Sequence, residues 1–179
     1  MKKMLSLAMA VLSFTLIGAN SASAAAGATS LKAGALGLNV GFGDSALGAN
    51  GVITVSGRYF LLNDLALQAG VGMQASSGDL DAKYFSTAIC VRKYFTTEEF
   101  APFVEGKFSY ISENIALKGV DASTVELSGN FGAEYFLNRQ FSIEGSVGVG
   151  LGRVDDKISN KDYTYLGTHT LGLSANFYF

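Results

Sequence analysis

Apolar side chains recur at every second position along most of the chain, and small or polar residues occupy the positions between them. In one such segment, Phe141 and Ile143 alternate with Ser142 and Glu144. A period of two is the repeat of a β-strand, whose successive side chains point to opposite faces, and no convincing 3.6-residue repeat competes with it. The pattern predicts strands over residues 34–42, 53–61, 65–74, 83–95, 103–110, 125–135, 141–152 and 165–179.

Eight segments of about ten residues, each apolar on one face and small or polar on the other, are the pattern of a membrane-spanning barrel. In lipid every backbone N–H and C=O must be paired, so a sheet has to close on itself. We therefore predict an all-β fold, an eight-stranded antiparallel transmembrane up-and-down β-barrel. A soluble lipocalin-like barrel is disfavoured because it would place charges on the outer face. Here the charges cluster at turns and on the face of small residues.

The links between the predicted strands are of two kinds. Three are tight and follow the aromatic pairs Tyr59-Phe60, Tyr94-Phe95 and Tyr135-Phe136. Four are longer and polar, at residues 43–50, 75–81, 112–122 and 153–162. Short turns are periplasmic and long loops extracellular in such barrels, so both chain ends are expected on the periplasmic side. We expect Tyr59, Tyr94 and Tyr135 to mark the periplasmic membrane interface.

The N-terminus has the composition of a cleavable secretory signal. Lys2 and Lys3 precede an apolar run, and a stretch of small residues offers cleavage after Ala24 or Ala26. The sequence thus predicts a leader at 1–24 and a barrel domain at 25–179, located in the outer membrane. The single cysteine, Cys90, lies too far away to make the protein a lipoprotein and has no partner for an internal disulfide.

The charge balance excludes one class of partner. The chain holds 13 Lys and Arg against 15 Asp and Glu, and loss of Lys2 and Lys3 with the leader changes the net charge from −2 to −4. Nucleic-acid binding requires a basic surface, so no nucleic-acid partner is expected.

Three stretches resemble the outer-membrane protein β-barrel domain superfamily, with its OmpA- and OmpX-like and opacity-type porin-like members. Residues 57–67 resemble its strand–turn–strand unit, Ala101-Pro102-Phe103 its proline-led fifth strand, and residues 171–179 its C-terminal assembly signal. The resemblance implies that Phe177 and Phe179 are read by the Bam assembly machinery through β-pairing. Periplasmic chaperones, outer-membrane lipid and lipopolysaccharide are the other implied partners, for a protein that is a monomer. The family hosts many functions, so the resemblance defines the fold better than the role.

The predicted inward face carries charged side chains of both signs. An eight-stranded barrel is just wide enough for side chains to fill, and buried charges persist when paired and hydrogen-bonded. We therefore expect a charged network that closes the lumen, and a narrow ion path is the alternative. The predicted network comprises Arg58, Arg92, Glu105, Lys107, Glu126, Glu134 and Glu144.

The sequence offers little catalytic chemistry, and we expect no enzyme, no catalytic residue, no metal site and no cofactor. His169, the only histidine, falls on the predicted lipid-facing register of the last strand and is expected near the outer girdle. Cys90 is expected to face inward as a small filler. The favoured function is a non-enzymatic protein of envelope integrity or surface interaction. The alternatives are a narrow porin-like channel and an adhesin that binds through its loops.

Overall fold

The structure is a computed structural model that describes residues 29–42, 53–76, 82–115, 120–157, 161–169 and 172–179. The predicted leader at 1–24 and the whole link at 43–50 lie outside these residues. Among the residues described, no helix is long and apolar enough to cross a membrane. The strands are β1 (Leu36–Phe42), β2 (Ile53–Leu62), β3 (Leu65–Ser76), β4 (Ala82–Tyr94), β5 (Phe100–Ile115), β6 (Val120–Asn138), β7 (Phe141–Asp156), β8 (Lys161–Thr168) and β9 (Gly172–Tyr178).

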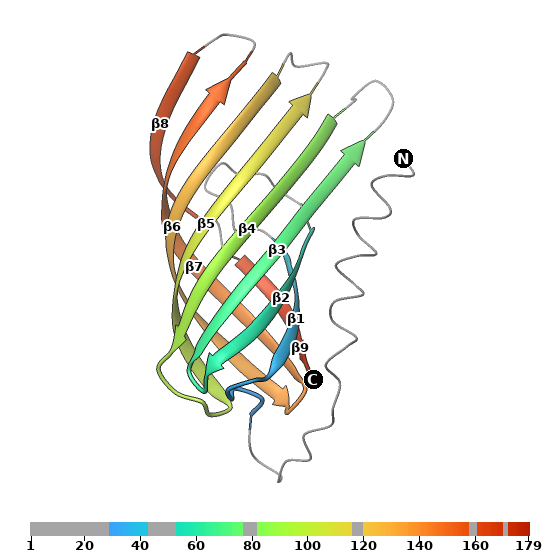
Figure 1. The fold of residues 1–179 in the computed structure, drawn as a ribbon, viewed down its shortest axis with the longest axis vertical. Coiled ribbons are helices and arrows are strands. Elements are labelled where there is room, and N and C mark those ends of the chain that lie inside the picture. The colour runs from blue at the N-terminus through green and yellow to red at the C-terminus, as the bar shows by residue number, and fades with distance from the viewer. Residues whose placement is uncertain (1–28, 43–52, 77–81, 116–119, 158–160, 170–171) are drawn as a thin grey trace.

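These strands form one antiparallel sheet that closes into a barrel (Figure 1). Each strand from β1 to β7 pairs with the next, and β1 closes the ring by pairing with β9. Both β8 and β9 pair with β7, at its two ends, so together they make one interrupted eighth strand. The prediction of an eight-stranded antiparallel barrel is confirmed.

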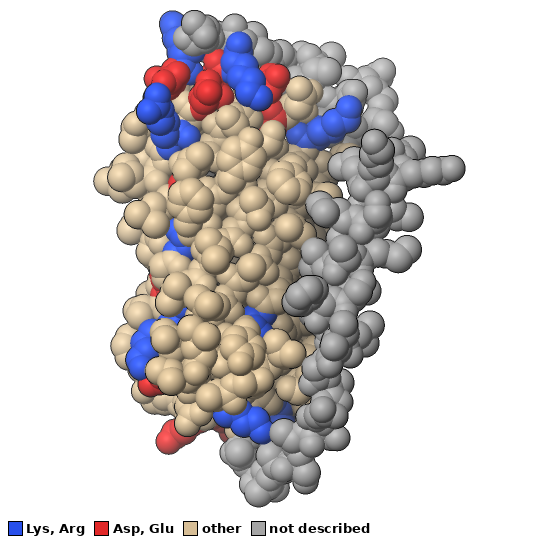
Figure 2. All heavy atoms as spheres, viewed as in Figure 1, with Lys and Arg blue, Asp and Glu red and all other residues tan. Residues whose placement is uncertain are grey.

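The outer face of the barrel wall is apolar and its inner face is polar, as a membrane-spanning barrel requires. Large apolar side chains such as Ile89, Leu127 and Phe131 are exposed on the outside, while Asn, Ser, Arg and Glu side chains are buried inside. Figure 2 shows one side of the molecule, where charges gather at the top and a smaller number lie near the bottom. The belt between them is almost free of charge, as contact with lipid hydrocarbon demands.

Strands extend into three of the predicted long links. β3 reaches Ser76 and β4 starts at Ala82, and the pairing of β5 with β6 continues to Ile115 and Val120. Similarly, β7 extends to Asp156 and pairs with the start of β8 at Lys161. Alternation failed to reveal these extensions because both of their faces are polar. Strand pairing above the lipid needs backbone hydrogen bonds but no apolar face.

The prediction that Tyr94 marks the membrane interface is wrong. Tyr59 and Tyr135 are exposed on the outer surface, but Tyr94 is only 1% exposed and points into the lumen. Phe95, the next residue, is exposed outside instead. The three Tyr-Phe pairs therefore do not repeat the same structure: in the middle copy the two rings exchange faces, as alternation from Val91 along β4 requires.

The prediction that His169 faces lipid is also wrong, because the last strand does not keep one register. Thr168 pairs with Val149 and Gly172 with Ser146, so three steps along β7 correspond to four steps along the last strand. One extra residue is a β-bulge, and it reverses the faces on its far side. His169 is consequently buried in the lumen, whereas Phe177 and Phe179 beyond the bulge are exposed outside.

The different surroundings of the last two residues predict different defects. Phe179 is 51% exposed on the lipid-facing side, and Tyr178 is 1% exposed inside the barrel. We expect deletion of Phe179 to slow assembly into the outer membrane more than Tyr178→Ala, and Tyr178→Ala to lower the stability of the assembled barrel. Pulse-chase assembly followed by heat-modifiable gel mobility measures both. Equal assembly rates for the two variants would contradict this assignment of faces.

Candidate functional site

The lumen is crossed by five charged side chains from five strands, here called the charged plug: Arg58, Arg92, Glu105, Glu134 and Glu144. Two carboxylates flank Arg58: its Nη1 lies 3.0 Å from Glu134 Oε2, and its Nη2 lies 2.9 Å from Glu144 Oε2. Arg92 continues the chain, 2.6 Å from Glu144 and 2.8 Å from Glu105. Glu144 therefore bridges the two guanidinium groups, and the ion pairs span from β2 to β7.

Uncharged side chains complete the hydrogen bonds of the plug. The hydroxyl of Tyr94 accepts from Arg58 at 2.8 Å and donates to Glu134 at 2.6 Å. Tyr178 does the same at 2.7 and 2.5 Å, and Ser142 also donates to Glu134. A buried charge is costly unless paired and hydrogen-bonded, and the completely buried Glu134 has both kinds of partner.

An apolar layer lies between the charged plug and the end of the barrel with the tight turns, which is the predicted periplasmic end. The rings of Phe60 and Tyr94 stack at 5.8 Å, and those of Phe136 and Tyr178 at 5.5 Å. The guanidinium of Arg92 lies 3.7 Å from the centre of the Phe103 ring, a cation–π contact that joins this layer to the plug. The buried aromatic side chains lie below the ion pairs, so two layers of different chemistry occupy the lumen.

Glu126 and Lys107 lie closer to the outer end than the plug. Glu126 Oε1 is 3.0 Å from His169 Nε2, and the Tyr165 hydroxyl donates to its other oxygen. Lys107 is buried on β5 beside the lumen cavity. The seven predicted network residues are thus all buried inside the barrel. Five belong to the plug, Lys107 lines the cavity, and Glu126 belongs to a separate cluster with His169.

Glycines on β7 make room for this outer cluster. A Cβ at Gly150 would lie 2.6 Å from His169 Nε2, and one at Gly152 would lie 2.5 Å from the Tyr165 ring. A Cβ at Gly148 would overlap the Asn130 side chain. Each of these glycines therefore faces a larger polar side chain from a neighbouring segment. The absence of a side chain at Gly148, Gly150 and Gly152 leaves the space that these polar groups occupy.

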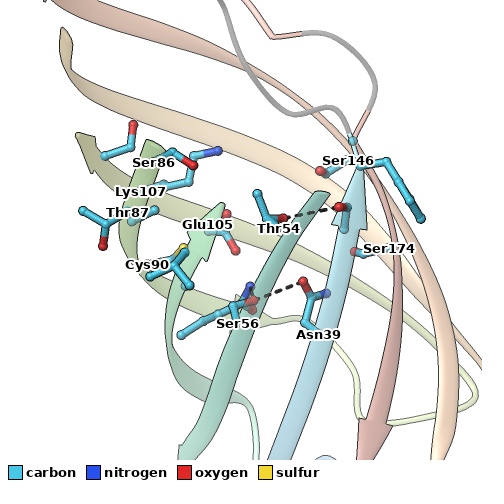
Figure 3. A pocket seen from close by; sticks show the side chains of 18 of the residues that line it. Asn39, Thr54, Ser56, Ser86, Thr87, Cys90, Glu105, Lys107, Ser146 and Ser174 are labelled. Carbon is cyan, nitrogen blue, oxygen red and sulfur yellow. Dashed lines mark hydrogen bonds between the residues drawn. The ribbon is translucent and has the colours of Figure 1, made fainter. Parts of the chain in front are cut away.

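A cavity of about 110 Å³ lies in the lumen on the outer side of the plug (Figure 3). Its wall is mainly small and polar, because the inward positions of β1 to β4 carry Ser, Thr and Gly. Arg92, Glu105 and Glu144 of the plug form its floor, and Lys107 and Cys90 also line it. Cys90 is buried there as expected. The cavity is large enough for several water molecules or a small polar solute.

Sequence reasoning missed the neutral partners of the plug. Tyr178 and Asn176 fall on the inward face of the predicted last strand, so alternation contained that signal, and Asn176 contacts Glu134 and Glu144 at 3.2 and 3.1 Å. The contact between Glu126 and His169 had no such signal because it depends on the bulge. Among the described residues, no group of three or more His, Cys, Asp or Glu is placed to hold a metal ion.

A closed eight-stranded barrel with an apolar exterior and a polar, side-chain-filled lumen defines a small integral protein of the outer membrane. A family model described as outer membrane protein beta-barrel domain matches residues 11–179. The chain belongs to this family.

Solved structures with the same fold are distant in sequence. The N-terminal β-barrel domain of Pseudomonas aeruginosa OprF aligns with a TM-score of 0.57 and 15% identity, covering 82% of this chain and 98% of that one. Neisserial surface protein A gives 0.53 and 16%, covering 81% and 96%. OprG from Pseudomonas aeruginosa gives 0.51 and 13%, covering 83% and 97%. A search of curated proteins finds no match to the sequence. At these identities the likeness concerns the fold alone.

Breaking the plug at Arg58 should be strongly destabilising. Arg58→Ala leaves Glu134 without its guanidinium partner, and removal of one member of a buried ion pair costs about 3–5 kcal/mol. Arg58→Met combined with Glu134→Gln should recover much of this loss because no unpaired charge remains. Urea unfolding in lipid vesicles, followed by heat-modifiable gel mobility, measures the free energy of unfolding.

The matched control is Lys93→Ala, which removes an exposed pair with Asp64 at the rim of the barrel. Exposed ion pairs contribute about 0–1 kcal/mol, so this variant should stay close to the parent. Similar losses for Arg58→Ala and Lys93→Ala would contradict the assignment of Arg58 to a buried network.

Two glycines test the packing of the outer cluster. Gly150→Ala should destabilise the barrel by about 1–3 kcal/mol, because the added methyl displaces His169 or Glu126. Gly129→Ala should be nearly neutral, since a Cβ there meets no atom within 4 Å. The same urea titration compares them, and a neutral Gly150→Ala would show that the space between β7 and β8 is open.

Proposed function

We propose that this protein is a small non-enzymatic barrel that contributes to the integrity of the outer membrane and to its surface, with a lumen that does not conduct. The observation that carries the proposal is the charged plug. Its five side chains are at most 6% exposed and are joined by four ion pairs of 2.6 to 3.0 Å. A solute crossing the barrel would have to break these pairs and displace the aromatic layer beneath them.

The proposal extends to how the protein reaches the membrane and what it meets there. A cleaved leader at 1–24 would direct it through the inner membrane. The outward apolar positions of Phe177 and Phe179 support recognition of the last strand by the Bam machinery after delivery by periplasmic chaperones. Charged side chains at the outer end, such as Arg153 and Lys157, are exposed where lipopolysaccharide headgroups would lie. Closure by the chain's own β1–β9 pairing is consistent with a monomer.

A narrow channel is the second candidate, and the lumen cavity is the observation that favours it. The cavity would form the outer half of a water path if the plug could move aside. No such path is needed for a protein that acts as a structural element, and the cavity would then hold ordered water.

Solute uptake by cells with and without the protein distinguishes the two candidate functions, because they predict different changes in uptake when the protein is lost. Loss of a closed structural barrel should raise entry of a hydrophobic dye and leave uptake of small hydrophilic solutes unchanged. Loss of a channel should lower hydrophilic uptake. In planar bilayers the purified protein should show no reproducible conductance steps. Steps that vanish when Glu105 or Arg58 is changed would overturn the closed-lumen proposal.

A further inference from the structure

The segment Thr29–Ala35, here called the strap, lies before β1 and crosses the periplasmic end of the barrel. The barrel has three tight turns at this end, between β2 and β3, between β4 and β5, and between β6 and β7. The strap forms a hydrogen bond with each of them. The donors and acceptors are Ala33 N to Asn63 Oδ1 at 3.0 Å, Thr29 Oγ1 to the Thr97 carbonyl at 2.6 Å, and Ser30 Oγ to the Arg139 carbonyl.

Leu31 anchors the strap in the barrel. Its side chain is 3% exposed and belongs to the buried apolar cluster that includes Phe60, Phe103 and Phe136. Its neighbours Lys32 and Ala33 are exposed. One leucine therefore enters the aromatic layer from below, while the residues on either side of it reach outward to the turns.

The backbone of the strap is folded into a defined shape. Lys32 N donates to the Ser30 carbonyl at 2.9 Å, and Ala35 N donates to the Lys32 carbonyl at 3.0 Å. Gly34 has a φ of +83°, a left-handed conformation that favours glycine. Gly34 N and the Ala35 carbonyl then pair with Phe60 on β2, so the strap leads directly into the barrel wall.

We propose that the strap is an internal ligand of the periplasmic mouth. It is a leucine-anchored peptide, seated in cis, that covers the aromatic layer and joins the three turns into one cooperative unit. Each turn also bonds to the next strand of the wall, since the Asp64, Glu99 and Gln140 carbonyls accept from the backbone N–H groups of Tyr94, Phe136 and Tyr178. Without the strap, no contact of this segment ties one turn to the other two, and each turn opens locally on its own. With it, opening of any turn requires release of the contacts that hold the other two. The inference concerns the end of the barrel and does not depend on whether the lumen conducts.

Hydrogen exchange of the refolded protein in lipid nanodiscs tests the proposal. Leu31→Asp places a carboxylate in the apolar layer and should expel the strap. Amide exchange should then accelerate by about tenfold or more, which corresponds to 1.4 kcal/mol, in peptides from all three turns together. Peptides from the strands at the level of the plug should keep their protection.

Lys32→Asp is the matched control, because it places the same carboxylate at the adjacent exposed position and should leave exchange at the turns unchanged. Leu31→Met should also preserve protection, since it keeps an apolar anchor. Heat-modifiable gel mobility checks that each variant is folded, and Leu31→Ala replaces Leu31→Asp if the latter does not fold. Acceleration at one turn only, at none, or equally in Lys32→Asp would overturn the proposal.

Discussion

Backbone hydrogen bonding in lipid is the constraint on which the rest of this structure depends. A strand in hydrocarbon must pair on both sides, so the sheet closes, and closing eight strands leaves a lumen about one side chain wide. Every second residue then points into that narrow space. The polar groups there have little access to water, and each has to find a partner across the barrel. Ion pairs such as Arg58–Glu134 and Arg92–Glu105 are the result.

Alternation alone predicted the class of fold, the strand order and the inward positions of the charged side chains, because a period of two leaves a clear trace wherever one face meets lipid. It did not predict how the charges would be grouped. Glu126 and Glu134 lie on the same face of β6, yet one contacts His169 and the other Arg58. The partner of each carboxylate depends on the stagger between strands and on local side-chain volume. Neither can be predicted from the sequence of one strand.

The errors have three different physical origins. The shared Tyr-Phe motif predicts the same face for Tyr59, Tyr94 and Tyr135, but the alternation along β4 points Tyr94 inward. Unbroken alternation from the C-terminus predicts that His169 faces lipid, but one extra residue in the last strand reverses the face. A bulge carries no reliable mark in a sequence rich in Gly and Thr. Polar strand ends such as residues 112–115 were equally hidden, because above the membrane neither face of a strand has to be apolar.

The contacts of Tyr178 connect the two ends of the folding chain. This residue is the second from the C-terminus, and its hydroxyl joins Arg58 of β2 to Glu134 of β6. Asn176 on the same strand bonds with Asn39 of β1 at 2.6 Å. A barrel whose last strand has not docked therefore retains an arginine that lacks part of its hydrogen-bond shell, held in an incompletely sealed lumen. Closure of the seam between β1 and β9 is therefore coupled to the interior: the charged groups of the lumen gain all their hydrogen-bond partners only when the last strand pairs with the first.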